Sequence, residues 1–203
     1  MKLVVIEGVG KKDTVKKYLG NDFEVMATKG HVRDLPEKSL AVDVNNNFEP
    51  QYVIMPDKQS IVNELQNKCK KAERVYLATD PDREGEAISW HLCYILGLNV
   101  NDPVRIEFNE ISKNAVQNAL LHPRGIDLNL VNAQQARRVL DRLVGYKLSP
   151  IICRKVQSNL SAGRVQSATL KLVVDRERSI RNFVKEEYWS VVVDLFKDIA
   201  DNS

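Results

Sequence analysis

The feature that most constrains this chain is the alternation of short apolar runs with helical patterns over its first 121 residues. Apolar runs rich in β-branched residues cover 2–8, the start of 23–35, 74–79 and 104–108. Helical spacing covers 13–20, 57–72, 86–97 and 112–121, with Ser112 as the expected N-cap. Strands that alternate with helices form a mostly parallel sheet with helices on both faces. The fold class is therefore predicted to be α/β.

The pattern changes after residue 121, where Pro123 and Gly125 interrupt it. Residues 128–148 and 163–183 then show helical spacing, and 188–196 has the composition of a further strand. We place a domain boundary near 122–126. This predicts an α/β domain over residues 1–122 and a mainly helical domain over residues 123–203.

Composition excludes several classes of protein. The chain of 203 residues is 43% hydrophobic and 28% charged, which is typical of a folded globular protein. Its apolar runs are too short for a membrane span or a signal peptide, so we expect a cytoplasmic protein without a membrane partner. Three scattered cysteines, without a C-x-x-C pair, predict buried reduced thiols and no disulfide or zinc site: Cys69, Cys93 and Cys153.

Charge is distributed unevenly along the chain. Residues 124–185 hold 13 Lys and Arg against 4 Asp and Glu, a net charge of +9, whereas the other residues hold 17 against 23, a net charge of −6. A basic segment beside an acidic one indicates a polyanionic partner such as nucleic acid. The alternative is a set of basic helices that are merely solvated.

Residues 76–90, YLATDPDREGEAISW, place four carboxylates within seven positions, directly after a predicted strand: Asp80, Asp82, Glu84 and Glu86. In α/β sheets, ligands lie at the carboxyl ends of the strands. Alternate carboxylates there suit a hard cation such as Mg²⁺, which would offset the repulsion between them. The alternative is a solvated acidic loop at a helix N-terminus, where the helix dipole stabilises Glu84 and Glu86.

Glu7 ends the first predicted strand, and a desolvated carboxylate in that position can act as a general acid or base. It can equally be an ordinary strand-end acid. The following residues, Gly8–Lys12, lack the spacing of a phosphate-binding loop, so no nucleoside triphosphate site of that type is expected.

The basic segment contains two candidate phosphate contacts. Gln134, Arg138, Asp141 and Arg142 share one polar helix stripe, which can touch phosphates or simply face solvent. Small residues before the helix start at 163 leave backbone N–H groups and Arg164 available to a phosphate.

Six segments resemble, in order, the N-terminal part of the type IA DNA topoisomerases, the bacterial topoisomerase I group: residues 4–20, 29–36, 76–92, 107–112, 133–150 and 160–177. DPDREGE (80–86) alone would indicate any Toprim-domain protein. Together with RRVLDRLVGY (137–146) and SAGRVQS (161–167), the resemblance is specific and covers nearly the whole chain.

The resemblance implies a Rossmann-like Toprim domain over 1–122, followed by the start of the helical domain that lines a single-strand DNA groove. It implies that Glu7 assists proton transfer at the scissile phosphate, and that His31 and Arg83 lie near the active site. The implied Mg²⁺ ligands are Glu7, Asp80, Asp82 and Glu84. The implied DNA-binding residues are Lys11, Arg138, Asp141, Arg142, Arg164 and Gln166.

The chain departs from the family pattern in two places. Family members carry S-P-x-K-A-K-T after the first glutamate, but here Asp13 replaces a lysine, while Lys11 and Thr14 keep their places. The family nucleophile is a tyrosine in a Y-x-R-T-like context further along the chain, and none of the six tyrosines here has that context. We therefore expect a fragment that does not relax DNA alone.

The resemblance implies part of an ATP-independent, monomeric enzyme of the nucleoid, acting on single-stranded and negatively supercoiled DNA. Such an enzyme relaxes supercoils by passing strands through a break held by a 5′-phosphotyrosine link. Two alternatives stay open: a stand-alone Toprim metal-dependent nuclease and a non-catalytic DNA-binding module.

Overall fold

The computed structural model describes residues 1–195, and these fall into two compact units, residues 1–162 and residues 163–195. The first unit is built on a three-stranded parallel sheet in the order β2-β1-β7. Its strands are β1 (Lys2–Ile6), β2 (Phe23–Ala27) and β7 (Arg74–Ala78). The predicted parallel α/β sheet is therefore confirmed.

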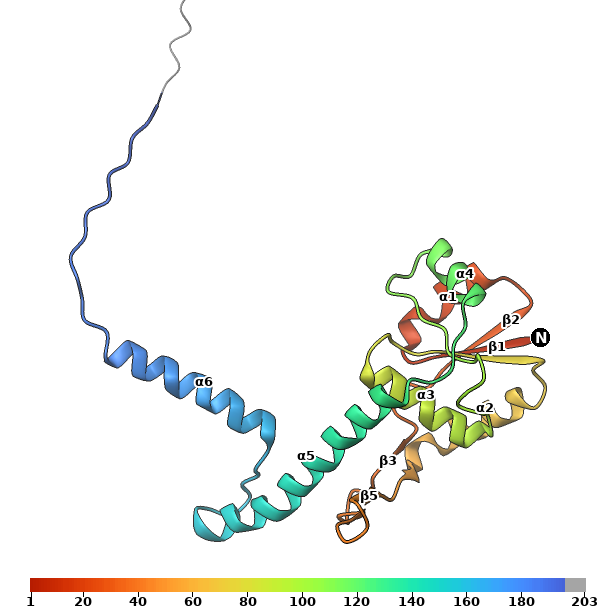
Figure 1. Cartoon of the computed structure of the whole chain (residues 1–203), viewed down its shortest axis with the longest axis horizontal. Coiled ribbons are helices and arrows are strands. Elements are labelled where there is room, and N and C mark those ends of the chain that lie inside the picture. The colour runs from red at the N-terminus through yellow and green to blue at the C-terminus, as the bar shows by residue number, and fades with distance from the viewer. Residues whose placement is uncertain (196–203) are drawn as a thin grey trace, which may run out of the picture. The chain divides into compact units, whose positions relative to one another are not determined.

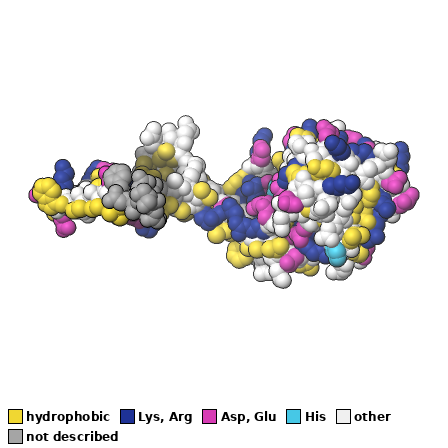
Figure 2. Space-filling model, turned by 90° about the horizontal axis from the view of Figure 1, so that it is seen from above, with side chains coloured by type: hydrophobic (Ala, Val, Ile, Leu, Met, Phe, Trp, Pro, Cys, Tyr) yellow, Lys and Arg dark blue, Asp and Glu magenta, His cyan; other side chains and the backbone are white. Residues whose placement is uncertain are grey.

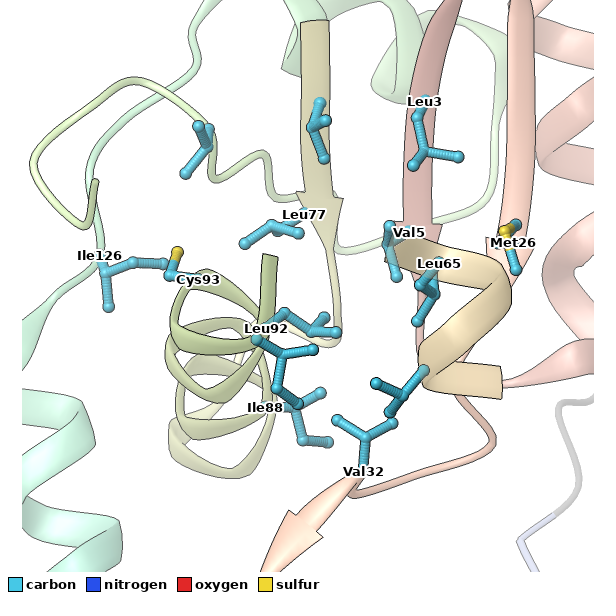
Figure 3. Close-up of a cluster of buried hydrophobic side chains, with 14 of the residues drawn as sticks. Leu3, Val5, Met26, Val32, Leu65, Leu77, Ile88, Leu92, Cys93 and Ile126 are labelled. Atoms are coloured by element: carbon cyan, nitrogen blue, oxygen red, sulfur yellow. The ribbon is translucent and has the colours of Figure 1, made fainter. Parts of the chain in front are cut away.

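Helices cover both faces of this sheet (Figure 1). On one face lie α1 (Lys12–Leu19) and α4 (Lys113–Leu121), and on the other lie α2 (Gln59–Cys69) and α3 (Arg83–Leu96). Alternate residues of a strand point to opposite faces, so Leu3 and Val5 of β1 pack on the α2 and α3 side (Figure 3). Val4 and Ile6 pack on the α1 and α4 side. The predicted cap of α4 is confirmed, because the Ser112 hydroxyl accepts from a backbone N–H in its first turn.

An irregular insertion lies between β2 and α2. It contains two short antiparallel pairs, β3 (Arg33–Asp34) with β6 (Val53–Ile54) and β4 (Val42–Asp43) with β5 (Glu49–Pro50). Two short 3-10 helices, η1 (Val9–Lys11) and η2 (Pro56–Lys58), precede α1 and α2. Leu35 and Val42 of the insertion pack against Val139 of α5 (Leu128–Lys155). This contact holds the insertion beside the longest helix.

The segment 104–108 is not a strand, so that prediction is wrong. Within this segment only Arg105 pairs with β7, opposite Leu77. The backbone N–H and carbonyl of Arg105 form hydrogen bonds with the backbone of Arg124, on the side away from β7. The segment lies in an extended position at the edge of the sheet, but its pairing with β7 stops after one residue. Apolar alternation predicted the extended backbone and could not predict the length of the pairing.

The helices of the basic segment begin where expected, and α5 runs past the predicted end at 148 and through Pro150 to Lys155. The second unit contains α6 (Arg164–Arg181), whose apolar side chains include the exposed Leu170, Leu172 and Val173. Figure 2 shows hydrophobic side chains on the surface of this unit. The strand predicted over 188–196 is wrong for the described residues 188–195, which form no regular structure. A strand needs a hydrogen-bonded neighbour, and none of the described residues pairs with them. Phe196 lies outside the described residues.

Cys69, Cys93 and Cys153 are free thiols, as predicted, but only Cys93 is fully buried. In the part of the chain that the structure describes, no helix is both long and apolar enough to cross a membrane. The domain boundary near 122–126 falls between α4 and α5 and stays a prediction.

A buried ion-pair network joins α3 to the segments beside β7. Glu86 and Arg105 are both 0% exposed, and Arg105 Nε donates to Glu86 Oε2 at 2.9 Å. Arg124 donates to both oxygens of Glu86, at 2.7 and 2.8 Å, and the backbone N–H of Asp127 donates at 2.7 Å. Burial alone would raise the pKa of Glu86, but these hydrogen bonds hold it below its ordinary value.

Arg105 also binds the backbone where the chain leaves β7. Its Nη1 donates to the carbonyls of Leu77 and Thr79 at 3.2 and 2.8 Å, and its Nη2 donates to the carbonyl of Asp80 at 2.8 Å. Hydrogen bonds from a charged donor are stronger than those from a neutral one. One guanidinium therefore fixes the path of the backbone into residues 80–84, the acidic loop.

We predict that Arg105→Met lowers the free energy of unfolding by about 3–5 kcal/mol, because it leaves the Glu86 carboxylate and several carbonyls buried with fewer partners. Urea unfolding of the two proteins measures the change. Lys71→Met, the same type of change at an exposed lysine, should shift the free energy by less than about 0.5 kcal/mol. Equal stabilities for wild type and Arg105→Met would contradict a structural role for this network.

Candidate functional site

The carboxyl ends of two neighbouring strands lie beside Glu7, the predicted catalytic acid, and Asp80, a predicted metal ligand. Ile6, the last residue of β1, pairs with Ala78, the last residue of β7. Glu7 and Asp80 therefore leave the sheet at the same edge. The pKa of Glu7 is raised, first by burial and then by the negative charges of Asp80 and Asp82. His31 and Lys11 oppose that rise.

The loop after β7 is packed tightly onto the start of α3. The Asp82 carboxylate accepts from the backbone N–H of Gly85 at 2.7 Å, which caps the helix and starts it at Arg83, earlier than predicted. A side chain at position 85 would bring its Cβ within 2.1 Å of the Asp80 carbonyl oxygen. Only glycine allows this approach. Arg83 lies exposed in the first turn of α3.

The three carboxylates predicted to share a metal contact different neighbours. Asp80 pairs with Lys11 Nζ at 2.7 Å, whereas Asp82 caps α3. Glu84 Oε2 accepts from Gln134 Nε2 at 3.1 Å and lies 3.5 Å from His31 Nε2. Residues 1–195 contain no group of three or more His, Cys, Asp or Glu side chains arranged to hold a metal. The carboxylate oxygens are nevertheless the donor type that a hard divalent cation takes.

A cavity of about 210 Å³ lies between this acidic loop and α5; it is lined by His31, Asp34, Tyr52, Glu84, His91, Gln134, Arg137, Arg138 and Asp141. Three buried polar atoms on these side chains have no hydrogen-bond partner among the described residues: Tyr52 Oη, His91 Nδ1 and Gln134 Oε1. Burial, with further contributions from Arg33 and His31, lowers the pKa of His91 to about 3. The His91 imidazole is therefore neutral at physiological pH.

Two arginines predicted to contact DNA form hydrogen bonds with the insertion. Arg138 Nε donates to Asp34 Oδ1 at 2.9 Å, and a second bond joins Arg138 Nη2 to Asp34 Oδ2. Arg142 donates to the carbonyls of Leu35 and Pro36 at 3.1 and 2.9 Å. Both side chains border a larger cleft of about 1030 Å³ between the insertion and α5, and Asp141 also lines it.

Arg164 and Gln166 lie in the first turn of α6, in the second unit. Their role on DNA stays a prediction. Sequence reasoning missed three residues at the site in the first unit, namely Arg105, Arg137 and His91. Arg137 Nη1 lies 3.9 Å from Glu84 Oε1. The signal available for Arg105 was a lone arginine within an apolar run, because a buried arginine requires an acid as partner.

Comparison with known families and structures agrees with this geometry. The Toprim domain family matches residues 2–111, and the family described as DNA topoisomerase matches residues 125–203. The structure of full-length topoisomerase I from Thermotoga maritima matches 90% of this chain with a TM-score of 0.83, and the two sequences are 48% identical. The match covers 31% of the Thermotoga chain, so the present chain spans about a third of its length.

Toprim domains bind divalent metal ions. The carboxylate oxygens that follow β7 are ligand atoms of the type that such ions take. The matched families follow one another along the chain in the order implied by the motifs, with a Toprim domain before a topoisomerase segment. The chain therefore belongs to the type IA DNA topoisomerase family and corresponds to its N-terminal, Toprim-containing part.

Proposed function

We propose that this chain supplies the metal-binding and acid–base half of an ATP-independent type IA topoisomerase that relaxes negative supercoils. The observation that carries the proposal is the convergence of Glu7 and the 80–84 acids at one edge of the parallel sheet, beside an arginine-bearing helix. Strand passage through a 5′-phosphotyrosine link conserves the energy of the phosphodiester, so no nucleoside triphosphate is needed.

We assign Mg²⁺ to Asp80, Asp82 and Glu84, with Glu7 beside them. When bound, Mg²⁺ neutralises and positions phosphate oxygens. Because the pKa of Glu7 is raised, Glu7 retains a proton at higher pH than an ordinary glutamate and can pass it to the leaving oxygen of the scissile phosphate. His31 lies against Glu84 and orients it. Arg83, exposed at the start of α3, is placed to meet a phosphate.

The DNA contacts belong to the cleft between the insertion and α5 and to the start of α6. There a single strand meets Arg138, Asp141 and Arg142, and further along the chain Arg164 and Gln166, while Lys11 serves the phosphate near Glu7. Arg138 exchanges its contact with Asp34 for a phosphate, because both are bidentate acceptors of a guanidinium. We propose that the enzyme acts as a monomer on DNA of the cytoplasmic nucleoid.

The nucleophilic tyrosine is the part of the reaction that this chain does not explain. None of its six tyrosines stands in a Y-x-R-T-like context. We propose that the nucleophile belongs to the part of a type IA enzyme that the matched third of the Thermotoga chain does not include.

Incubation with negatively supercoiled plasmid, with and without Mg²⁺, tests this function. The products are separated on a gel before and after treatment with protease and denaturant. We expect unchanged plasmid, together with binding to single-stranded oligonucleotides. Mg²⁺-dependent nicking without protein attached to the DNA ends would overturn the proposal in favour of a hydrolytic Toprim nuclease.

The double variant Asp80→Asn/Asp82→Asn should lose the Mg²⁺ dependence of single-strand DNA binding, because it removes two of the oxygen charges that hold the cation. Fluorescence anisotropy of a labelled oligonucleotide over a range of Mg²⁺ concentrations measures it. Asp22→Asn, the same change at an exposed aspartate, should leave the response as in wild type. An identical Mg²⁺ response in the double variant would favour a DNA-binding module without a metal site.

Glu7→Gln should stabilise the metal-free protein at pH 8 and have no such effect near pH 4. The folded-state pKa of Glu7 is raised, so ionising Glu7 destabilises the fold, and the free energy of unfolding falls as pH rises from the ordinary glutamate value of about 4.3 through the raised pKa. Urea unfolding in EDTA at the two pH values measures the effect. Glu37→Gln, at an exposed glutamate, is the control. A loss of stability at pH 8 in Glu7→Gln would contradict the cause assigned to the shift.

A further inference from the structure

The Glu84 carboxylate faces α5 with both of its oxygens. Glu84 Oε2 accepts from Gln134 Nε2 at 3.1 Å, and Glu84 Oε1 lies 3.9 Å from Arg137 Nη1. Gln134 and Arg137 are one turn apart on α5. The neighbouring acid Asp80 is held instead by Lys11, on the α1 side of the sheet. The acids of this loop therefore have different neighbours, since Asp80 pairs with Lys11 whereas Glu84 contacts α5.

Gln134 is an unusual residue for its position. Gln134 is 6% exposed and lines the 210 Å³ cavity, and its Oε1 has no hydrogen-bond partner among residues 1–195. A buried amide with one unpaired end is unfavourable compared with an apolar side chain of similar size. The bond to Glu84 is the hydrogen bond that the structure gives to this side chain. Gln134 thus contributes to the acidic site more than to the packing of α5.

We propose that Gln134 is a positioning residue that holds Glu84 on α5, so that a metal ion at the acidic loop has to compete with Gln134 for this carboxylate. The proposal rests on the metal-binding role proposed above for Asp80, Asp82 and Glu84. It links the occupancy of the metal site to the helix that carries the candidate DNA-binding arginines. A ligand that moves α5 would thereby change metal affinity, and the metal would change the energy of that movement to the same extent.

Removing the Gln134 amide should therefore tighten metal binding. A hydrogen bond to a carboxylate is stronger than one between neutral groups, but Glu84 is 41% exposed, which weakens it. We expect Gln134→Met to lower the dissociation constant of the metal roughly three- to tenfold. Methionine keeps the length and unbranched shape of glutamine without its donor. The amide oxygen that it removes is already unpaired, so the variant should fold.

The experiment is a titration of the 203-residue chain with Mn²⁺, in which free Mn²⁺ is followed by electron paramagnetic resonance. Gln135→Met is the matched control, because it makes the same change one residue along α5, where the side chain lines a different groove. Gln134→Asn, whose amide is one methylene shorter, is a second test that keeps the side chain polar. Thermal unfolding of each variant shows that it is folded.

A double-mutant cycle identifies the path of the effect. If Gln134 acts through Glu84, Gln134→Met should change Mn²⁺ affinity in the wild-type background and not in the Glu84→Gln background. Unchanged or weaker Mn²⁺ binding by both Gln134 variants would overturn the inference, as would the same gain in Gln135→Met or in the Glu84→Gln background.

The outcome also separates this inference from the proposed function. If the wild-type chain binds Mn²⁺ and Asp80→Asn/Asp82→Asn does not, the metal assignment is supported, and the result does not depend on the Gln134 variants. If wild type shows no Mn²⁺ binding that depends on Asp80 and Asp82, both the metal assignment and the role of Gln134 are wrong.

Discussion

The buried pair of Glu86 and Arg105 is the interaction on which the rest of the site depends. Both side chains are completely buried, and the Arg105 guanidinium reaches the carbonyls of Thr79 and Asp80 as well as Glu86. The Arg105 guanidinium thus connects the edge of the sheet, the first turns of α3 and the start of the acidic loop. A buried ion pair adds little net stability compared with apolar packing. What this pair supplies is a defined position for Asp80 relative to the strand ends.

Four like charges within seven residues require stabilising neighbours, and the structure shows a different neighbour for each. Glu86 is neutralised by two arginines, Asp80 lies beside Lys11, and Asp82 accepts from the first turn of α3. Glu84 faces His31 and α5. The four carboxylates are therefore each stabilised by different protein groups. Under the metal assignment proposed above, a cation at this loop would replace some of these contacts, and its affinity would depend on residues well outside the acidic motif.

The sequence predicted the parts of this fold that depend on local patterns. Apolar runs and helical spacing located β1, β2, β7 and the helices, and the rule that ligands lie at strand ends located Glu7 and Asp80. It could not locate contacts between distant segments, such as Arg138 with Asp34 across 104 positions. The same limit explains the wrong strand at 104–108, because apolar alternation says nothing of where pairing with β7 stops. The partners of Glu86 were missed because a buried arginine has no periodic signal.

The arginines of α5 show that a sequence motif does not reveal the tertiary contacts of its residues. Read as sequence, Arg138 and Arg142 form a polar stripe available to phosphates. In the structure their donors bind Asp34 and the carbonyls of Leu35 and Pro36, and so hold the insertion against α5. A phosphate that takes these donors also loosens the insertion, which carries Asp34 and Tyr52 of the cavity wall. Glu84 and Gln134 line the same cavity. Under the DNA-binding role proposed for α5, a phosphate on its arginines would therefore act on the wall that also holds Glu84.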